Sequence, residues 1–369
     1  IVILSAAFFS GLGWYLKTGN IFKAFQVVTS ILVVSCPCAS GVALPMIEDR
    51  AAIHLRREGV YLREISLWNR LLQVKKLVFD KTGTLTMESL EMENLEKLRE
   101  LKKEDQRILF SLVRASLHPV SSAIRKELLA LDSTLDHGPG YGSPQEVVGM
   151  GIEMMVEGTL YRLGRAEWAV GSNEPSTVWS RDGKCLLEMT FKEKIRDEAL
   201  ETIQEFQRRG FEIFLLSGDR SEKVKAMART LGIGEENAFS EMSPRQKEEW
   251  FEKRSQSDTL MLGDGANDSL AFNRSFCTGT PAIDRGFLQK KSDFYWMGES
   301  LRGIVSLFDV ALLRQKTIRR VIGFAILYNV VTLGICVYGG MNPVLAAILM
   351  PSSSLVTLAI AFQGVPIKK

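Results

Sequence analysis

The sequence has little net charge, few cysteines and only three histidines. Its 46 lysines and arginines nearly balance its 43 aspartates and glutamates, so the net charge of +3 gives no indication of a nucleic-acid partner. Five cysteines in 369 residues, spread unevenly, argue for reduced thiols and against a disulfide framework. The chain has no initiator methionine and no basic segment before its first apolar run, so we expect no signal peptide and the C-terminal part of a longer protein.

Charged residues are almost absent from the two ends of the chain. Four apolar runs lie there, at residues 2–16, 24–46, 321–339 and 343–362. A helix needs about 20 apolar residues to cross the hydrocarbon core of a membrane, so the last three runs are long enough and the first is somewhat short. We therefore expect four membrane helices in two hairpins, within residues 1–46 and 321–364.

Basic residues indicate on which side of the membrane the rest of the chain lies. Residues 47–320 carry most of the charge and form a predicted soluble body, whereas the turn GGMN at 339–342 is uncharged. The basic residues next to the apolar runs are Arg50, Arg56, Arg57, Arg314, Lys316, Arg319, Arg320, Lys368 and Lys369. By the positive-inside rule the body is cytoplasmic, and we expect an integral protein of a bacterial inner (cell) membrane.

Three predicted strands in the soluble body each end in a short polar motif. Residues 75–80 lead into "DKTGTLT", residues 211–216 into "SGDR", and residues 259–262 into "GDGANDS". A helical pattern, SEKVKAMARTLG, follows the second motif. A parallel α/β sheet binds phosphate ligands at the carboxyl ends of its strands, so the predicted fold is a doubly wound α/β domain.

The residue types in these motifs suit phosphoryl transfer. An aspartate on a tight loop, here Asp80, can act as a nucleophile and form a phosphorylated intermediate. Asp264 and Asp268 supply the hard oxygen ligands that Mg²⁺ prefers, and Lys247 in "SPRQK" can neutralise a transferred phosphoryl group. Hydroxyl and backbone donors would come from Thr82, Ser217 and Gly218. A GDG or SGD alone is usually only a turn, so the hypothesis depends on all three motifs following strands in this order.

Together, "DKTGTLT", "SGD" and "GDGAND" resemble the phosphorylation-domain motifs of P-type ATPases, within the haloacid-dehalogenase superfamily, and the resemblance covers the whole chain. It implies a haloacid-dehalogenase-like phosphorylation domain in residues 64–87 and 183–300, with Asp80 as the aspartyl phosphate. The residues that would assist are Lys81, Thr82, Ser217, Gly218, Asp219 and Lys247. The cofactors implied are ATP and Mg²⁺, with the metal held by Asp80, Thr82, Asp264, Asn267 and Asp268. Ser217 stands where the family usually has threonine, which preserves the hydroxyl group.

A separation of 184 positions between Asp80 and Asp264 is too long for one crossover, so we expect an inserted α+β domain in residues 88–182. His118 precedes a proline, which favours an extended backbone, and taken alone it is more often a surface histidine. With "GMG", however, the segment resembles the nucleotide-binding domain of heavy-metal P-type ATPases. That likeness implies ATP contacts from His118, Pro119, Gly149, Gly151 and Gly164. Leu117 departs from the family's usual glutamate, and Glu193 in "EKIR" stands where aspartate is common.

The first hairpin contains Cys36-Pro37-Cys38. On a regular helix two residues that are two apart point to different faces, but a proline breaks the hydrogen-bond ladder and can let both thiols turn toward one point. Soft thiolates select Cu(I), Zn²⁺ or similar ions. The alternative is that both cysteines are small buried hydrophobic residues.

The second hairpin adds polar and thioether groups at predicted membrane depth. They are Tyr328, Asn329, Met350, Ser353 and Ser354. Such groups are costly in a membrane and usually functional, although serine often only bonds to its own helix. This set resembles the copper(I) subgroup, because zinc and cadmium members use charged Lys and Asp at these places. The resemblance therefore implies that the seven residues of the two hairpins bind the transported ion.

The function we expect is ATP-driven translocation of Cu(I), or Ag(I), through an aspartyl phosphate. Related pumps carry an actuator domain with a Thr-Gly-Glu loop, and no "TGE" occurs here. We therefore expect upstream membrane helices and an actuator in the parent protein, and this chain to be phosphorylated without full turnover. Further expected partners are membrane lipid and a soluble copper chaperone. The alternatives are a zinc or cadmium pump, a soluble aspartate-based phosphatase, and a regulatory metal-binding membrane protein with a silent ATPase core.

Overall fold

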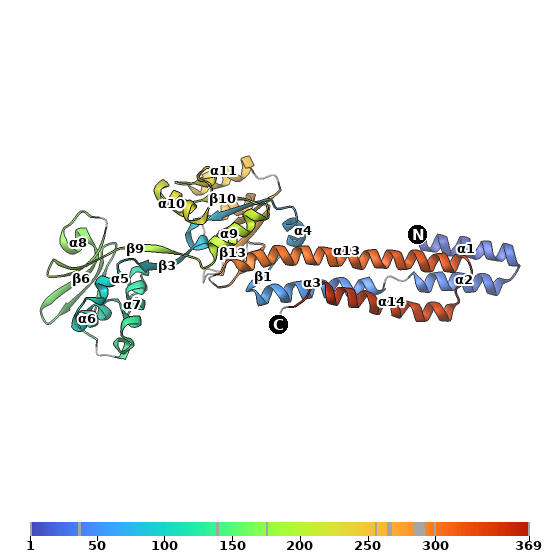
Figure 1. Cartoon of the computed structure of the whole chain (residues 1–369), viewed down its shortest axis with the longest axis horizontal. Coiled ribbons are helices and arrows are strands. Elements are labelled where there is room, and N and C mark those ends of the chain that lie inside the picture. The colour runs from blue at the N-terminus through green and yellow to red at the C-terminus, as the bar shows by residue number, and fades with distance from the viewer. Residues whose placement is uncertain are drawn as a thin grey trace. The chain divides into compact units, whose positions relative to one another are not determined.

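The computed structural model describes residues 2–35, 38–137, 140–174, 176–254, 257–263, 268–282, 292–298 and 300–367 (Figure 1). The chain forms two compact units. The first comprises Ile1–Asp80 and Glu198–Lys369, and the second comprises Lys81–Asp197. The predicted inserted domain, residues 88–182, falls within the second unit, but the predicted domain boundaries themselves stay predictions.

A seven-stranded sheet forms the soluble part of the first unit, in the order β1-β14-β13-β12-β2-β10-β11. Its strands are β1 (Val60–Leu62), β2 (Lys76–Asp80), β10 (Glu212–Leu216), β11 (Ala238–Phe239), β12 (Thr259–Leu262), β13 (Cys277–Pro281) and β14 (Phe294–Trp296). All neighbours are parallel except β1 and β14. Every residue of β12 is buried, as are four of the five residues of β2, because parallel strands are covered on both faces. The expected doubly wound fold is confirmed.

Short amphipathic helices cover this sheet. They are α4 (Leu67–Leu71), α9 (Ala199–Arg208), α10 (Ser221–Leu231), α11 (Pro244–Arg254) and α12 (Ser269–Arg274). Helix α9 buries Ala199, Thr202, Ile203 and Phe206, which share one face at a spacing of three and four residues. In α11, Trp250 and Phe251 enter a core that also contains residues of β2, β10 and β12. This packing fixes α11 beside the carboxyl ends of the central strands.

The second unit contains two antiparallel sheets and its own helices. Strands β3 (Thr86–Met92) and β9 (Phe191–Ile195) pair with each other. The five-stranded sheet consists of β4 (Gln145–Val147), β5 (Gly151–Val156), β6 (Thr159–Arg165), β7 (Thr177–Arg181) and β8 (Lys184–Met189). The helices are α5 (Leu95–Arg99), α6 (Lys103–Val113), α7 (Pro119–Leu131) and α8 (Ala166–Val170). A core of buried apolar residues from α6, α7 and the sheet, with Trp179 fully buried, holds this unit together.

Five helices form a bundle in the first unit (Figure 1). They are α1 (Val2–Thr18), α2 (Ile21–Val34), α3 (Cys38–Arg57), α13 (Arg302–Val337) and α14 (Pro343–Gly364). Helix α13 has 36 residues and also contacts α9 and β1 of the sheet domain, so one continuous helix joins the two parts. The α1–α2 turn is tied to the α13–α14 turn by hydrogen bonds from Trp14 Nε1 to the Val337 oxygen (2.8 Å) and from Lys23 Nζ to the Gly339 oxygen (3.1 Å).

The structure agrees with part of the prediction of four membrane spans. Among the described residues, α13 and α14 are long and apolar enough to cross a membrane, and α2 is a shorter apolar helix. The predicted span 24–46 is divided between α2 and α3, with residues 36–37 outside the described part of the chain. The predicted span 321–339 is only the end of α13, because the helix starts at Arg302 in a segment whose charges predicted soluble structure.

Candidate active site

The first and second motifs meet at one edge of the sheet, because their strands are neighbours. Strand β2 lies between β10 and β12, and Asp80 at its end is directly opposite Leu216 of β10. Asp80 is buried, with 6% of its surface exposed. Of the third motif, Asp264 and Asn267 lie outside the described residues, whereas Asp268 is described and buried. The carboxyl edge predicted for the site is therefore where Asp80 and Asp268 lie.

Lys247 connects these two carboxylates. Its Nζ lies 2.5 Å from Asp80 Oδ1 and 2.8 Å from Asp268 Oδ1, and all three side chains are buried. Burial by itself lowers the pKa of Lys247, but the charges of Asp80 and Asp268 and the hydrogen bonds to both outweigh it, so the pKa is raised above its ordinary value. The ammonium group is therefore held charged next to the predicted nucleophile.

The charge balance of this cluster suits a divalent cation. Two buried carboxylates, those of Asp80 and Asp268, share the ammonium group of Lys247. Carboxylate oxygens are the ligands that Mg²⁺ prefers, so Asp80 and Asp268 fit such an ion. Among the described residues no group of three or more acidic, histidine or cysteine side chains has metal-binding geometry. A complete ligand set would therefore need groups beyond these two carboxylates.

Ser217 is held rigidly at the end of β10. Its amide donates to the Phe239 oxygen (2.9 Å), its carbonyl accepts from the Met242 amide (3.0 Å), and its hydroxyl accepts from the Asp219 amide (3.1 Å). The side chain is 1% exposed. The Ser217–Asp219 loop therefore has a fixed backbone, and Gly218 lies between two residues that are joined by a hydrogen bond.

Strand β9 holds the segment that follows Asp80 in sequence. Lys81 is buried and its Nζ lies 2.5 Å from Glu193 Oε2, while Arg196 donates to the Gly83 oxygen at 2.9 Å. Gly83 has a left-handed backbone (φ 69°), which favours glycine, and Thr82 is extended and exposed. Sequence analysis noted Glu193 only as a departure and missed Arg196, although both occur in the quoted segment "EKIR". No pattern in the sequence indicated these two contacts, because they depend on the pairing of β9 with β3.

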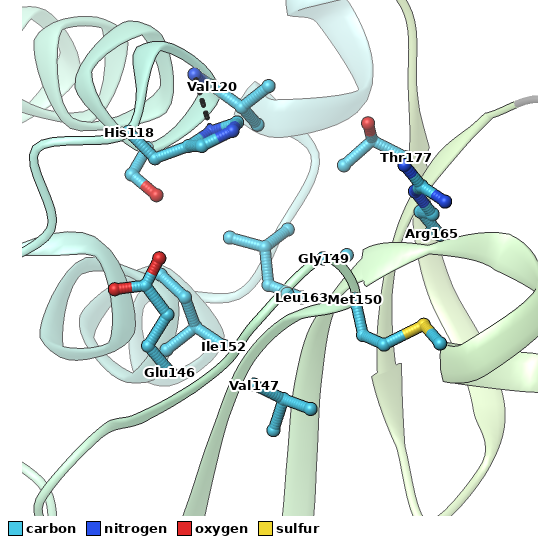
Figure 2. Close-up of a pocket in the computed structure, with 13 residues that line it drawn as sticks. His118, Val120, Glu146, Val147, Gly149, Met150, Ile152, Leu163, Arg165 and Thr177 are labelled. Carbon is cyan, nitrogen blue, oxygen red and sulfur yellow. Dashed lines mark hydrogen bonds between the residues drawn. The ribbon is translucent and has the colours of Figure 1, made fainter.

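A cavity of about 320 Å³ in the second unit brings together four of the five predicted ATP contacts (Figure 2). His118, Gly149, Gly151 and Gly164 line it, whereas Pro119 is the first residue of α7 and does not. His118 is extended (φ −63°, ψ 138°), as its place before proline predicted, and its Nδ1 accepts a hydrogen bond from the Val120 amide at 3.3 Å. Lining residues that sequence analysis missed include Glu146, Leu163, Arg165 and Thr177.

The glycines of the cavity permit two strands to approach closely. Gly151 of β5 and Gly164 of β6 are register partners. A Cβ atom on Gly151 would collide with the Leu163 oxygen and the Gly164 Cα, and one on Gly164 would collide with the Met150 oxygen. A side chain lacks space at both positions, and Gly151 also has a positive φ of 158°, which residues with side chains rarely adopt.

We expect Gly151→Ala to lower the thermal midpoint of the second unit and to weaken ATP binding. The added methyl group overpacks the β5–β6 pair, at a cost of about 1–3 kcal/mol, and displaces the wall of the cavity. Calorimetric titration with ATP and thermal unfolding of the full chain in detergent measure both effects. Gly140→Ala is the matched control, because a Cβ there meets open space. Equal behaviour of the two variants would contradict the packing argument.

The predicted ion-binding residues of the bundle are only partly described. Cys36 and the side chain of Cys38 lie outside the described residues. Within the described chain, the Tyr328 hydroxyl and Asn329 Oδ1 are buried without a hydrogen-bond partner. The hydroxyls of Ser353 and Ser354 donate to the Met350 carbonyl at 2.8 and 3.1 Å. These two serines therefore bond to their own helix, which was the alternative to a role in ion binding. The role of this set in ion binding stays a prediction.

Comparison with known proteins places the chain in a family. A family model described as a haloacid dehalogenase-like hydrolase matches residues 74–275. The nitrogen fixation protein FixI of Rhizobium meliloti (strain 1021) is 31% identical over 97% of this chain and 46% of its own length. The copper-transporting ATPase of Saccharomyces cerevisiae (strain ATCC 204508 / S288c) is 26% identical over 96% of this chain and 39% of its own length.

The fold comparison agrees with the sequence comparison. The crystal structure of a zinc-transporting PIB-type ATPase in an E2.Pi state matches with a TM-score of 0.71 at 21% identity, over 99% of this chain and 62% of that chain. The chain spans about half the length of the curated relatives it matches. The resemblance inferred from the three motifs is confirmed. The chain therefore belongs to the haloacid dehalogenase-like hydrolase family, with the fold of a metal-transporting P-type ATPase.

Proposed function

We propose that the protein to which this chain belongs moves Cu(I), or Ag(I), across a membrane and drives this with ATP through an aspartyl phosphate at Asp80. The observation that carries the proposal is the buried cluster of Asp80, Lys247 and Asp268 at the carboxyl end of β2. A carboxylate that is buried, paired with a lysine and placed at the end of a parallel strand has the environment of an acyl-phosphate nucleophile.

The chemical step transfers one phosphoryl group. An Asp80 oxygen attacks the γ-phosphorus of ATP, the bond from that phosphorus to the β-phosphate oxygen breaks, and ADP leaves with the bonding electron pair. Lys247 lies 2.5 Å from Asp80 Oδ1, so its ammonium group can stabilise negative charge on the transferred group. Mg²⁺ held by Asp80 and Asp268 would supply further neutralisation of phosphate charge.

The cavity of the second unit is the proposed ATP site. His118 presents a ring and Leu163 an apolar surface to it, as a purine base requires, and Arg165 is exposed at its edge. Arg165 lies on the side of the cavity that Thr177 shares, opposite His118 (Figure 2). A guanidinium group there can contact the phosphates of a nucleotide whose base lies near His118.

Two of the proposed ion ligands, Asn329 on α13 and Met350 on α14, lie at similar distances along their helices from the turn that joins them. Asn329 lies eight residues before the end of α13 and Met350 seven residues after the start of α14, so at 1.5 Å per residue each is about 11 Å from their common turn. Helix α2 starts near the same turn, where Lys23 bonds the Gly339 oxygen, and ends about 16 Å from it at Val34. Cys36 and Cys38 follow directly in sequence.

Copper is favoured over zinc by ligand chemistry. Thiolate and thioether sulfur suit Cu(I). Helix α13 adds two buried oxygens, those of Tyr328 and Asn329, that have no hydrogen-bond partner within the described part of the chain. The yeast relative is a copper-transporting ATPase, and the zinc-transporting structure shares the fold at 21% identity. A soluble phosphatase would not need α13 and α14, each apolar enough to span a membrane. The soluble units would face the cytoplasm of a bacterial cell, and a copper chaperone and upstream domains of the parent protein would be the partners.

Metal-dependent phosphorylation tests this proposal. The chain in detergent is incubated with γ-labelled ATP and Mg²⁺, and we expect a hydroxylamine-labile phosphoprotein whose yield responds to Cu(I) or Ag(I) and not to Zn²⁺. Replacing Cys36 and Cys38 together by serine should remove the response. Cys185→Ser is the control, because Cys185 is an exposed thiol on β8 of the second unit. A response to Zn²⁺ alone would favour the zinc pump, and a copper response that survives the double replacement would refute the sulfur site.

A further inference from the structure

The proposed ATP cavity contains one carboxylate that sequence analysis did not anticipate. Among the described residues that line the cavity, Glu146 is the only acidic one, and it lies on the short strand β4. Figure 2 shows its carboxylate directed toward His118. Glu146 is exposed, and within the described part of the chain its side chain forms no ion pair or hydrogen bond. Its acceptor atoms are therefore available to a ligand.

The ring of His118, next to Glu146, indicates which hydrogen-bonding groups such a ligand must carry. Because His118 Nδ1 accepts the Val120 amide hydrogen, the neutral ring carries its proton on Nε2. His118 and Glu146 thus present a hydrogen-bond donor and an anionic acceptor on the same side of the cavity. Leu117, the residue before the histidine, is 91% exposed and does not line the cavity, so it supplies no alternative acceptor.

Charge fixes which end of a nucleotide can approach Glu146. The triphosphate is anionic and is repelled by a carboxylate, whereas Arg165 on the opposite side of the cavity attracts it (Figure 2). The neutral base therefore lies at the His118 and Glu146 side. Adenine carries an amino group at C6 that donates hydrogen bonds and ring nitrogens that accept them, which matches an anionic acceptor beside a donor.

We propose that Glu146 selects adenine nucleotides by accepting a hydrogen bond from the amino group at C6. This inference rests on the proposed function, because it requires that the cavity binds ATP. Hydrogen bonds to a charged acceptor are roughly twice as strong as neutral ones, so a carboxylate at this place can decide between bases.

A double-mutant cycle between protein and ligand tests the contact. ATP is compared with purine riboside triphosphate, which lacks only the amino group at C6, by calorimetric titration of the full chain in detergent without Mg²⁺. We expect the wild type to bind ATP about tenfold more tightly than purine riboside triphosphate, and Glu146→Ala to bind both with the weaker affinity. Glu146→Gln keeps a carbonyl acceptor, so it should retain part of the preference.

The controls separate this inference from the proposed function. Gln145→Ala changes the preceding residue of β4, which is exposed and does not line the cavity, and should leave both affinities unchanged. If the wild type binds neither triphosphate, both the proposed ATP site and the inference about Glu146 are wrong. If ATP binds but Glu146→Ala weakens both ligands equally, or if GTP is the preferred ligand, only the assignment of Glu146 is overturned.

Discussion

Asp80→Asn is expected to reduce labelling of the chain by γ-labelled ATP to the background of a denatured sample. The amide has no anionic oxygen to attack phosphorus, and loss of a nucleophile in a well-studied hydrolase costs about 10⁶ in kcat. The other carboxylate of the cluster, Asp268, is bonded to Lys247 and lies on a different segment, at the start of α12, so it does not take the place of Asp80. The measurement is acid-quenched labelling followed by hydroxylamine treatment, which cleaves acyl phosphates.

The Asp80→Asn variant should keep its fold, so a loss of labelling would show that the nucleophile is missing and not that the protein has unfolded. In Asp80→Asn, Lys247 retains Asp268 at 2.8 Å, and the cluster changes from two carboxylates per ammonium group to one. Asp258→Asn is the matched control, because Asp258 pairs with Lys76 at the amino end of the same sheet, with an Nζ to Oδ2 distance of 3.3 Å. Full labelling of Asp80→Asn, or equal loss in Asp258→Asn, would contradict the assignment of the nucleophile.

The edge of the sheet where Asp80 lies was predictable from sequence because strand order follows simple rules. Buried parallel strands are short apolar runs, and polar motifs at their carboxyl ends gather at one edge. The strands ending at Asp80, Leu216 and Leu262 were recognisable on this basis, and they are neighbours in the sheet. The structure brings Lys247 Nζ to 2.5 Å from Asp80 Oδ1, and the role of Lys247 toward a phosphoryl group stays a prediction.

Contacts made by short strands and by residues distant in sequence were not predictable. Glu193 meets Lys81 because β9 returns to β3 after a long insertion, and no local pattern encodes that pairing. Glu146 lies on a strand of three residues, which is too short to show an alternation of inward and outward side chains. The start of α13 was missed for a different reason. Its first turns carry charged residues that pair with the sheet domain, Arg302 with Glu198 and Asp309 with Arg209. That segment therefore lacks the apolar signature of a membrane span.

Lys247→Met is expected to destabilise the sheet domain as well as to abolish phosphorylation. Removing the ammonium group leaves Asp80 and Asp268 buried without their shared cation, and breaking a buried pair in this way costs about 3–5 kcal/mol. For a domain of this size that corresponds to a fall of roughly 10 °C in thermal midpoint. Hydrogen exchange in peptides covering β2 and β12 should locate the loss to this edge of the sheet. Lys253→Met, an exposed position on the same helix, is the control.

The pH dependence of the same variant separates charge from packing. The pKa of Lys247 is raised in the folded protein above its ordinary value of 10.5, so the folded state holds this proton more tightly than the unfolded chain. The stabilisation is therefore fully present below about pH 10.5 and is lost as pH rises through the folded pKa. The difference in stability between wild type and Lys247→Met should be constant at neutral pH and shrink in alkaline solution.

Added Mg²⁺ should stabilise Lys247→Met more than the wild type, because a divalent cation can take the place of the missing charge between the two carboxylates. A difference that persists unchanged through the alkaline range, with no gain from Mg²⁺, would show that the methylene stem of Lys247 stabilises the domain and its ammonium group does not.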